Sequence, residues 1–342
     1  MLIFSLRRLS LFLFTIVLLT ILSFSLSFLF PGDQLINLSG QVNATEEQLA
    51  LLSESYRQGD SIISQYFAYL SHIMNADMGV SMSSQFPVWD EVIIHLPPTI
   101  ELTFVALVMA MAVGIPLGFV AAIHHRTKID NAVLTLSMLG YSIPVFWLGL
   151  LVILVFSIEL GWFPSSGQIS LLFEVEPVTG LLLIDILLSD SAFKWEAFQN
   201  ALAHIILPAC VVALAPATIF IRLARTSMMQ VLDSHYITAA SAKGLSLRQI
   251  IYRHGIRNAM VNVIRDVGLQ FANLVTLAMV TEMIFSWPGI GRWLIESIYQ
   301  RDYTAIQGGL LVLSSYIFIV HILTDFIYAW LNPMARGKKY GT

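Results

Sequence analysis

The sequence is poor in charged residues. Only 12% of its 342 residues are Asp, Glu, Lys or Arg, whereas 57% are hydrophobic. A soluble domain usually carries about a quarter charged residues, so this composition excludes an ordinary soluble protein and predicts an integral membrane protein. The net charge of −4 decides little, because in a membrane protein the distribution of charge matters more than its sum.

Cysteine and catalytic motifs are also scarce. Cys210 is the only cysteine, which excludes an intrachain disulfide and a cysteine-based metal site. The sequence contains no G-x-x-x-x-G-K-[ST] phosphate loop, no H-E-x-x-H and no G-x-S-x-G. We therefore expect no catalytic residue, metal site or cofactor in this chain, and no nucleic-acid binding.

Long apolar runs are what the chain has instead. A helix needs roughly 20 apolar residues to cross the hydrocarbon core. Six stretches qualify: residues 9–30, 99–123, 131–160, 201–223, 263–285 and 305–331. The first is too long for a signal peptide and lacks a small-residue cleavage site, so we expect it to be retained. The sequence predicts an all-α integral membrane protein with six transmembrane helices.

Lys and Arg are distributed unequally between the two sides of this layout. Fourteen fall on one side: Arg7, Arg8, Arg126, Lys128, Arg222, Arg225, Lys243, Arg248, Arg253, Arg257, Arg265, Arg336, Lys338 and Lys339. Only four fall on the other: Arg57, Lys194, Arg292 and Arg301. Because basic residues accumulate on the cytoplasmic side, both termini are predicted to be cytoplasmic.

The spans divide the chain into four parts. Residues 1–30 hold the N-terminal end and the first span, and 31–98 form a polar outer segment with a helical pattern in "TEEQLALLSESYRQG". Residues 99–331 form a core with an outer insertion, 161–200, and a cytoplasmic loop, 224–262. Residues 332–342 form a cytoplasmic tail. The outer segments are long enough for small caps, not for independent cores.

The cytoplasmic loop contains a stretch unlike its surroundings, "YITAASAKGLSLRQIIYRHGIRNAM" (236–260). Ser234 is expected to cap a short helix that stops at Gly244, a residue suited to the left-handed conformation. Ser246 and Gln249 form an S-x-x-Q capping box that opens a second helix to about Arg257. The first helix is too short to be stable alone, so it must dock against something. A plain basic loop attracted to anionic lipid is the alternative, but it does not explain the alanines, the glycine and the capped restart.

This stretch resembles the EAA loop of ABC-importer permeases, in the form found in the dipeptide and oligopeptide branch. The resemblance implies a type I (MetI-like) permease fold and an ATPase-coupling helix formed by Tyr236, Ala239, Ala240, Ser241, Ala242, Lys243, Gly244, Leu245 and Ser246. The Glu that names the motif is absent, and so is its later Leu-Pro. Both departures are typical of the peptide branch.

The resemblance covers the whole chain. It includes "ADMGVSMSSQFPVWDEVIIHLPPTIELT" (76–103), "SIPVFWLGLLVILVFSIELGWFPSSG" (142–167), "HIILPACVVALAPATIFIRLARTSM" (204–228) and "TEMIFSWPGIGRW" (281–293). Within the branch, "FEVEPVTGLLLIDILLSDS" (173–191) is similar to Sap-type permeases, which are associated with antimicrobial-peptide uptake and resistance and with polyamines.

The resemblance implies a permease subunit of an ATP-driven ABC transporter that moves peptides across the bacterial inner membrane by alternating access. Its expected partners are a second homologous permease, two cytoplasmic ATPases that use ATP and Mg²⁺, a periplasmic solute-binding protein and the lipid bilayer. One alternative is an ABC permease for another cationic solute, such as putrescine, in import or export. The others are an ion-coupled secondary transporter, which would want a midplane acid or repeated halves with unwound helices, and a membrane-embedded enzyme.

Several residues near the spans receive roles as expectations. Loop support is expected from Arg222, Arg225, Arg253 and Arg257. Asp325 is expected to have a structural role, by hydrogen bonding or by pairing with a base such as Arg222 or Arg225. Glu282 and Glu101 are candidates for the substrate path, and an interfacial acid that keeps its water is the alternative for Glu282. The outer loop Trp287, Pro288, Gly289 and Gly291 is expected to turn at the interface, with Trp287 and Trp293 as belt residues. Kinks are expected at Pro116, Pro144, Pro208 and Pro216.

Overall fold

The computed structural model describes residues 2–331, and the side chains of 9–329. Within this range the chain is helical and has no β-strand, although one isolated antiparallel bridge joins Val80 to Pro87. The predicted tail, 332–342, and the side chains of Arg7, Arg8, Arg336, Lys338 and Lys339 lie outside the described residues.

Six spans can be traced among the described residues, and one of them is broken. Five helical runs are long and apolar enough to cross a membrane: α1 (Leu2–Leu29), α5 (Val88–Ile123), α9 (Lys194–Leu232), α11 to α12 (Leu247–Ile284) and α14 (Tyr303–Leu331). The sixth consists of α6 (Lys128–Ser142) followed by α7 (Val145–Val152) and the π-helical η1 (Ile153–Glu159), bent by 97°. The prediction of six spans is confirmed in this form.

The bend lies within the span predicted at 131–160 and confirms the kink expected at Pro144. Pro144 is the N-cap of α7, and Ile143 before it is extended, with φ −78° and ψ 122°. A residue before proline is pushed out of the helical region by the proline ring, so α6 ends there and α7 starts in a new direction. Pro208 and Pro216, in contrast, lie inside the unbroken α9.

The described chain separates into two compact units. The first comprises residues 2–99, 176–185 and 288–318, and the second comprises 100–175, 186–287 and 319–331. The helices α5 and α14 each contribute to both units. Within each unit, packing joins parts of the chain that lie far apart in the sequence.

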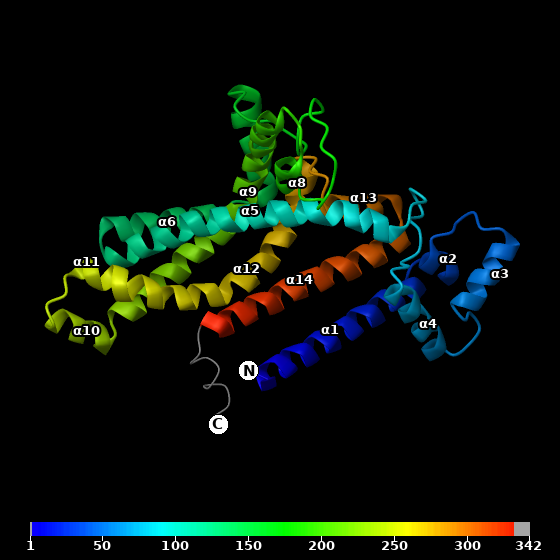
Figure 1. The fold of residues 1–342 in the computed structure, drawn as a ribbon, viewed down its shortest axis with the longest axis horizontal. Helices are drawn as coiled ribbons and strands as arrows, with labels where there is room; N and C mark the ends of the chain where they lie inside the picture. Colours follow the sequence, from blue (N-terminus) through cyan, green and yellow to red (C-terminus); the bar gives the residue numbers. More distant parts are fainter. Residues whose placement is uncertain (1, 332–342) are drawn as a thin grey trace. The chain divides into compact units, whose positions relative to one another are not determined.

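In the first unit, α2 (Gln34–Ser39), α3 (Glu46–Ser55) and α4 (Ile62–Met74) follow α1 (Figure 1). The helical pattern read in "TEEQLALLSESYRQG" is confirmed by α3, which starts at a Thr45–Gln48 capping box. A small core unites Phe24, Leu35, Leu38, Tyr56 and Tyr69. Burial raises the pKa of Tyr69 to about 12, and its hydroxyl bonds to Ser23 Oγ at 2.8 Å. The outer segment therefore has a core of modest size.

Asp302 fixes the segment that leads into α5. Its carboxylate accepts hydrogen bonds from the Ser81 hydroxyl at 2.5 Å and from the amide and hydroxyl of Ser83, both at 3.0 Å. The other carboxylate oxygen accepts from the Ala305 amide at 3.0 Å, at the start of α14. A fully buried carboxylate needs such donors, and here they join two parts of the first unit that lie far apart in the sequence.

In the second unit α9 is the central helix, packed against α6, α7 and α12 (Ile256–Ile284). It also lies very close to α5 at Gly114 and Gly118. A Cβ atom on Gly114 would lie 2.6 Å from the carbonyl oxygen of Ala217, and one on Gly118 would lie 2.4 Å from that of Ile221. The two glycines form a G-x-x-x-G pattern, which lets membrane helices approach backbone to backbone.

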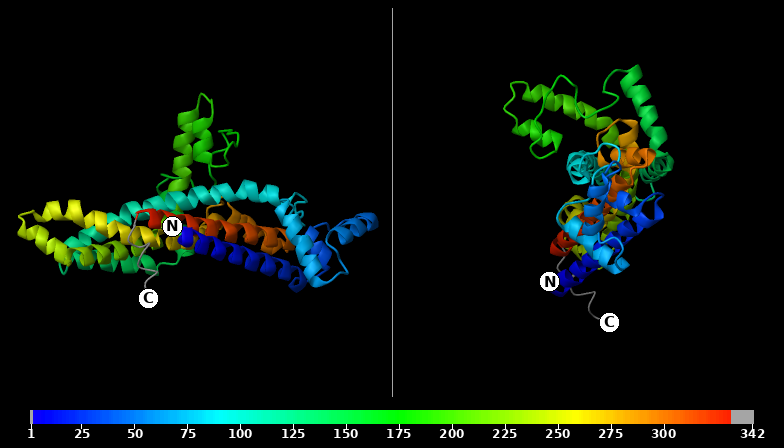
Figure 2. Two further views of the ribbon diagram at one scale, coloured as in Figure 1. Left: turned by 60° about the horizontal axis from the view of Figure 1, so that its bottom comes forward. Right: turned by 90° about the vertical axis from the view of Figure 1, so that its right-hand side faces the viewer.

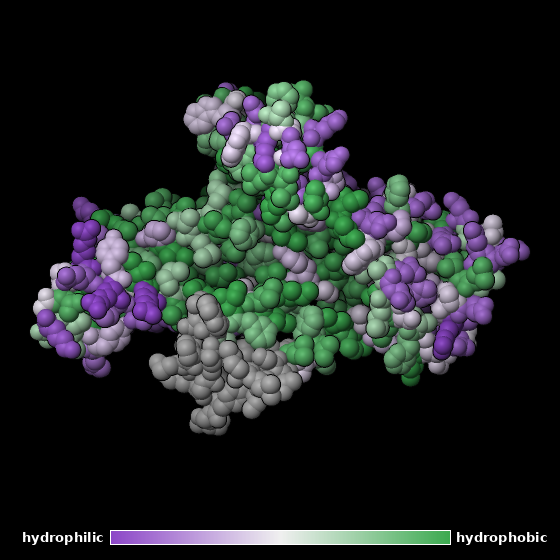
Figure 3. All heavy atoms as spheres, in the orientation of Figure 1, coloured by the Kyte–Doolittle hydropathy of each residue, from purple (hydrophilic) through white to green (hydrophobic). Residues whose placement is uncertain are grey.

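The surface matches a membrane location. In Figure 3 the visible faces of α5, α12 and α14 are largely hydrophobic, and hydrophilic residues gather over α10 (His235–Ala242) and α11 (Leu247–Ile250). Large apolar side chains such as Phe14 and Phe104 are more than half exposed on spans. In lipid this exposure is favourable, because no water meets these side chains.

Candidate functional site

The predicted helix–glycine–helix element is present between α9 and α12. In Figures 1 and 2, α10 and α11 lie together at the same end of the long α9 and α12 helices. Gly244 between them has φ +86°, the left-handed conformation predicted for it, and its amide donates to Ser241 O at 2.9 Å. Left-handed backbone favours glycine because it has no Cβ.

The second helix starts at the predicted capping box. The Ser246 amide donates to Gln249 Oε1 at 2.9 Å, and the Gln249 amide donates to Ser246 Oγ at 3.4 Å. The expected cap at Ser234 is wrong in its chemistry. Ser234 is the N-cap residue of α10, but its hydroxyl donates backward to Val231 O at 2.5 Å, so α10 begins without a side-chain cap.

The second helix was predicted to end near Arg257, but it continues beyond that residue. It runs from α11 through the π-helical η2 (Ile251–Gly255) directly into α12. A π segment inside an α-helix is often found at functional sites. Residues 235–255, which we call the coupling hairpin after the role predicted for them, therefore continue into a transmembrane span, because α11, η2 and α12 follow one another without a break.

Buried apolar side chains stabilise the hairpin. Ile237 of α10 is 6% exposed, and Ile250 of α11 is 2% exposed. Each buried side chain of this size contributes about 2 kcal/mol. The Asn258 amide on α12 donates to the Tyr236 hydroxyl at 3.1 Å. These contacts supply the stability that an isolated eight-residue helix lacks.

The side of α10 away from Ile237 carries small, exposed side chains. Ala239, Ser241, Ala242 and Lys243 are exposed, as is Gly244, and a Cβ on Gly244 would meet nothing within 4 Å. Ala240 and Leu245 are partly buried, whereas Ser246 is exposed. Small side chains here let a partner approach the helix backbone closely. This surface is therefore available to another protein.

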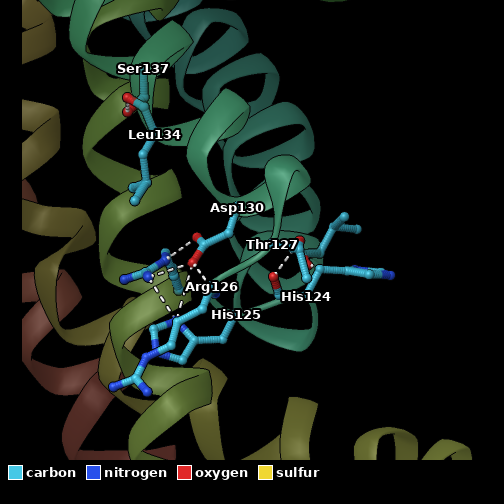
Figure 4. A network of polar contacts seen from close by, with 9 residues as sticks. His124, His125, Arg126, Thr127, Asp130, Leu134 and Ser137 are labelled. Carbon is cyan, nitrogen blue, oxygen red and sulfur yellow. Dashed lines mark hydrogen bonds and ion pairs between the residues drawn. The ribbon is translucent and has the colours of Figure 1, made fainter.

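A buried ion pair braces the span that leads into the hairpin. Asp130, in the first turn of α6, is 2% exposed. Arg225 on α9 binds it bidentately, from Nε to Oδ1 at 2.6 Å and from Nη2 to Oδ2 at 2.8 Å. The Arg126 amide donates to Oδ2 at 3.0 Å, and His125 Nδ1 lies 3.1 Å from the same atom. Figure 4 shows Asp130 and His125 converging on this guanidinium.

Sequence reasoning missed Asp130 and His125. Asp325 was expected to hydrogen-bond or to pair with a base, for example Arg222 or Arg225; its carboxylate lies 3.9 Å from another basic group, His321 Nε2, one turn earlier on α14, and Arg225 binds Asp130. The available signal was the acid three residues after Thr127, the N-cap of α6, at the turn that joins two spans. An acid at that position accepts backbone donors and complements the helix dipole.

The other basic residues of the loop lie at the surface. Arg253 and Arg257 are exposed, and so is Arg222, whose guanidinium carbon lies 5.2 Å from the centre of the Tyr141 ring. Their expected part in supporting the loop stays a prediction.

The outer loop is packed rather than interfacial. Trp287 is 1% exposed and Trp293 is 8% exposed, so neither is a belt residue as predicted. In the first unit, Trp293 Nε1 donates to Glu91 Oε2 at 3.1 Å, and the Ile290 amide donates to Thr99 Oγ1 at 2.9 Å. These bonds join the start of α13 (Ile290–Gln300) to α5.

The residues of this loop are buried or partly buried. Gly289 is the N-cap of α13, and both Gly289 and Gly291 are buried. Pro288 is partly buried, and His95 Nδ1 lies 3.1 Å from its carbonyl oxygen. The segment "PGIG" therefore packs the start of α13 against the first turns of α5.

The two candidate acids of the substrate path are both buried in this chain. Glu282 is 0% exposed and Glu101 is 7% exposed. The reading of Glu282 as an interfacial acid that keeps its water is therefore wrong. Glu101 Oε2 lies 3.5 Å from the Gln168 amide nitrogen, at the limit of a hydrogen bond. A role for either acid in the substrate path stays a prediction.

Among the described residues, no group of three His, Cys, Asp or Glu side chains could hold a metal ion. The fold defines a class: a helical membrane protein with several spans and a helical hairpin between two of them.

Comparison with known proteins places the chain within that class. Residues 114–337 match the family described as "Binding-protein-dependent transport system inner membrane component", and residues 1–103 match the N-terminal region of that system's membrane component. The chain belongs to this family. It is a multi-pass inner-membrane permease, and the family's general partners are ATPase subunits and a binding protein.

Individual relatives match along their whole length. The chain is 41% identical to the putrescine export system permease protein SapB of Escherichia coli K12, over 99% of each protein. It is 40% identical to the peptide transport system permease protein SapB of Salmonella typhimurium, over 99% of each. It is 39% identical to the dipeptide transport system permease protein DppB of Escherichia coli K12, over 99% of this chain and 100% of the relative.

Among solved structures, a chain of the inward-facing MetNI methionine ABC transporter aligns with a TM-score of 0.49. The alignment has 17% sequence identity and covers 69% of this chain and 93% of that chain.

Proposed function

We propose that this chain is the permease subunit of a peptide-type ABC transporter and that α10 is its ATPase-coupling helix. The observation that carries the proposal is the two-sided character of α10. Ile237 anchors one face, while the small side chains of Ala239 and Ala242, on the side away from Ile237, are exposed. A surface held rigidly on one side and cleared of bulk on the other suits tight docking into a partner.

The proposed assembly contains a second homologous permease, two cytoplasmic ATPases and a periplasmic binding protein. The asymmetry of Lys and Arg supports an orientation with both termini and the coupling hairpin on the cytoplasmic side. The ATPases would then meet α10, and the binding protein would meet the outer caps and the Pro288–Gly291 loop. ATP and Mg²⁺ are used by the ATPases, and this chain carries out no chemistry of its own.

The proposed mechanism is alternating access driven through the hairpin. Closure of the ATPase dimer moves α10, and the movement passes directly to α12, because α11, η2 and α12 form one unbroken helix. The Asp130–Arg225 pair keeps α6 and α9 together while this happens. A rigid connection is needed because a flexible joint would absorb the displacement instead of transmitting it.

We further propose peptides as the substrate class, with antimicrobial peptides as a candidate. Two relatives named for peptide or dipeptide transport match the chain over nearly its full length, which supports this proposal. The relative named for putrescine export supports the alternative of a polyamine and an outward direction. The substrate of the binding protein that works with the chain decides between them.

The test compares two glycines in the assembled transporter. Gly244 and Gly59 both have positive φ, +86° and +98°, and a Cβ on either meets nothing within 4 Å. Valine at either position therefore introduces the same strain, about 1–2 kcal/mol. We expect Gly244→Val to abolish substrate-stimulated ATP hydrolysis and Gly59→Val, in the outer segment, to preserve it. The proposal fails if no ATPase co-purifies with the chain, or if the two variants behave alike.

A further inference from the structure

A cavity of about 430 Å³ opens in the second unit, at the bend between α6 and α7. Its walls come from the end of α6, the start of α7, and the facing sides of α9 and α12. The volume lies in the range of sites that hold small organic ligands. Pro144, which breaks the span, turns α7 away from the line of α6 and so creates the space.

The polar groups of the cavity are neutral and gathered on α12. Gln270, Asn273 and Thr276 line it, spaced by three residues so that they lie on one helix face. Gln270 is 7% exposed, and Asn273 Nδ2 donates to its Oε1 at 3.5 Å. Side-chain amides carry both donors and acceptors, which is the complement of a peptide bond.

The remaining lining is apolar, for example Leu148, Val211 and Ile219. The lining residues that the structure describes include no Asp, Glu, Lys or Arg. A charge does lie at the edge: the Arg222 guanidinium carbon is 5.2 Å from the centre of the Tyr141 ring, and Tyr141 is a lining residue. Arg222 is outside the lining itself, but it places a positive charge beside Tyr141, and the described lining has no carboxylate.

From this arrangement we infer that the cavity is a peptide-binding subsite. It takes backbone amides on Gln270, Asn273 and Thr276, and it places a terminal carboxylate toward Arg222. This inference rests on the proposed transport function and adds where, and by which groups, the substrate is held. The site binds the backbone and the terminal carboxylate of the peptide and makes no specific contact with its side chains. It therefore accepts peptides of many sequences.

The same chemistry disfavours a diamine. A doubly charged amine needs carboxylates or aromatic faces to replace its water. The lining offers no acid, and the face of Tyr141 is already occupied by Arg222. The described lining therefore offers putrescine amide and hydroxyl oxygens but no carboxylate.

The test uses the assembled transporter with its binding protein in lipid nanodiscs. Cys210→Ser removes the only cysteine. Thr276→Cys then places a thiol in the cavity wall, and Leu269→Cys places a control thiol on the same helix, 55% exposed and outside the lining. The probes are trialanine, trialanine amide and putrescine. Labelling of each thiol by N-ethylmaleimide and ATP hydrolysis are measured on the same samples.

We expect trialanine to slow labelling of Thr276→Cys by about tenfold at ten times its half-saturating concentration, because only the empty fraction reacts. Labelling of Leu269→Cys should not change. The amide, which lacks the carboxylate, should protect less, and Arg222→Gln should remove the difference between the two peptides. Thr276→Val should raise the half-saturating peptide concentration about two- to tenfold.

Each other outcome is decisive. If trialanine stimulates ATP hydrolysis without protecting Thr276→Cys, the subsite is wrong and the transport proposal stands. If putrescine stimulates ATP hydrolysis and protects the thiol, both the peptide function and the subsite are wrong. Both also fail if none of the three compounds stimulates ATP hydrolysis or protects the thiol. A thiol that reacts in the isolated chain but never in the assembled transporter shows that the second permease covers the cavity, which also overturns the inference.

Discussion

Asp130 and Arg225 form a bidentate ion pair between α6 and α9, with contacts of 2.6 and 2.8 Å. The acid is 2% exposed and the Arg225 side chain 17%. Removing one member of a buried pair leaves a charge without a partner, which commonly costs about 3–5 kcal/mol. Arg225 lies on α9, the helix that leads into the coupling hairpin. The pair therefore bears both on the stability of the fold and on the proposed movement of the hairpin.

A double-mutant cycle measures this pair. Asp130→Asn and Arg225→Gln should each lower the unfolding temperature of the purified chain. The double variant should be more stable than the sum of the two losses predicts, with a coupling energy of about 1–3 kcal/mol. Arg265 and Asp266, also joined at 3.2 Å, provide a control, because the Arg265 side chain is 57% exposed. Arg265→Gln should have little effect, and additive losses in the first cycle would refute the pairing.

The close approach of α5 and α9 can be tested with single methyl groups. Gly118→Ala would place its Cβ 2.4 Å from the carbonyl oxygen of Ile221, so the helices must separate. Gly140→Ala is the matched control, because its Cβ would lie 3.4 Å from Leu214 and Thr218, at the edge of ordinary contact. We expect Gly118→Ala to lower the unfolding temperature and the yield of folded protein, and Gly140→Ala to do neither. Equal stability of both variants would contradict the packing described.

Asp185 predicts a pH-dependent loop in the first unit. Burial opposes ionisation of this carboxyl, but the hydroxyl and amide of Thr179, at 2.6 and 2.7 Å, and the Gly180 amide, at 3.0 Å, lower its pKa. A carboxyl whose folded pKa is depressed stabilises the fold above its unfolded pKa. That stabilisation disappears as the pH falls through the lower, folded value.

Hydrogen exchange of residues 176–190 should therefore quicken as the pH is lowered below about 4, after correction for the intrinsic pH dependence of exchange. Asp185→Asn should exchange faster at neutral pH and show no further change in this range. Asp190→Asn, outside this hydrogen-bond set, serves as the control. If the wild-type segment keeps constant protection down to pH 3, the carboxylate does not hold the loop.

The sequence was most informative where local chemistry determines structure. The left-handed Gly244 and the Ser246–Gln249 capping box depend on a few adjacent residues, and both were predictable. The apolar runs likewise revealed the spans, because a span is defined by length and composition. The π segment that fuses α11 to α12 leaves no comparable local signal, so the predicted end near Arg257 was wrong.

Contacts between distant segments could not be derived from the sequence. Asp130 meets Arg225 across 95 positions, and Asp302 meets Ser81 across 221. The residues next to each acid in the sequence do not indicate which distant residue it binds. Trp287 and Trp293 were misjudged for a related reason: a tryptophan near a span end suits an interface or a packed junction equally, and only the folded chain shows that both are buried.

The central claim is that the exposed face of α10 docks on an ATPase subunit. The most direct measurement is crosslinking of Ala242→Cys, in a Cys210→Ser background, with a short bifunctional thiol reagent in the assembled transporter. Leu51→Cys, 64% exposed on α3, is the control in the outer segment. The account predicts a crosslink from Ala242→Cys to an ATPase subunit and none from Leu51→Cys. An intact complex in which Ala242→Cys reacts freely and gives no such crosslink would contradict it.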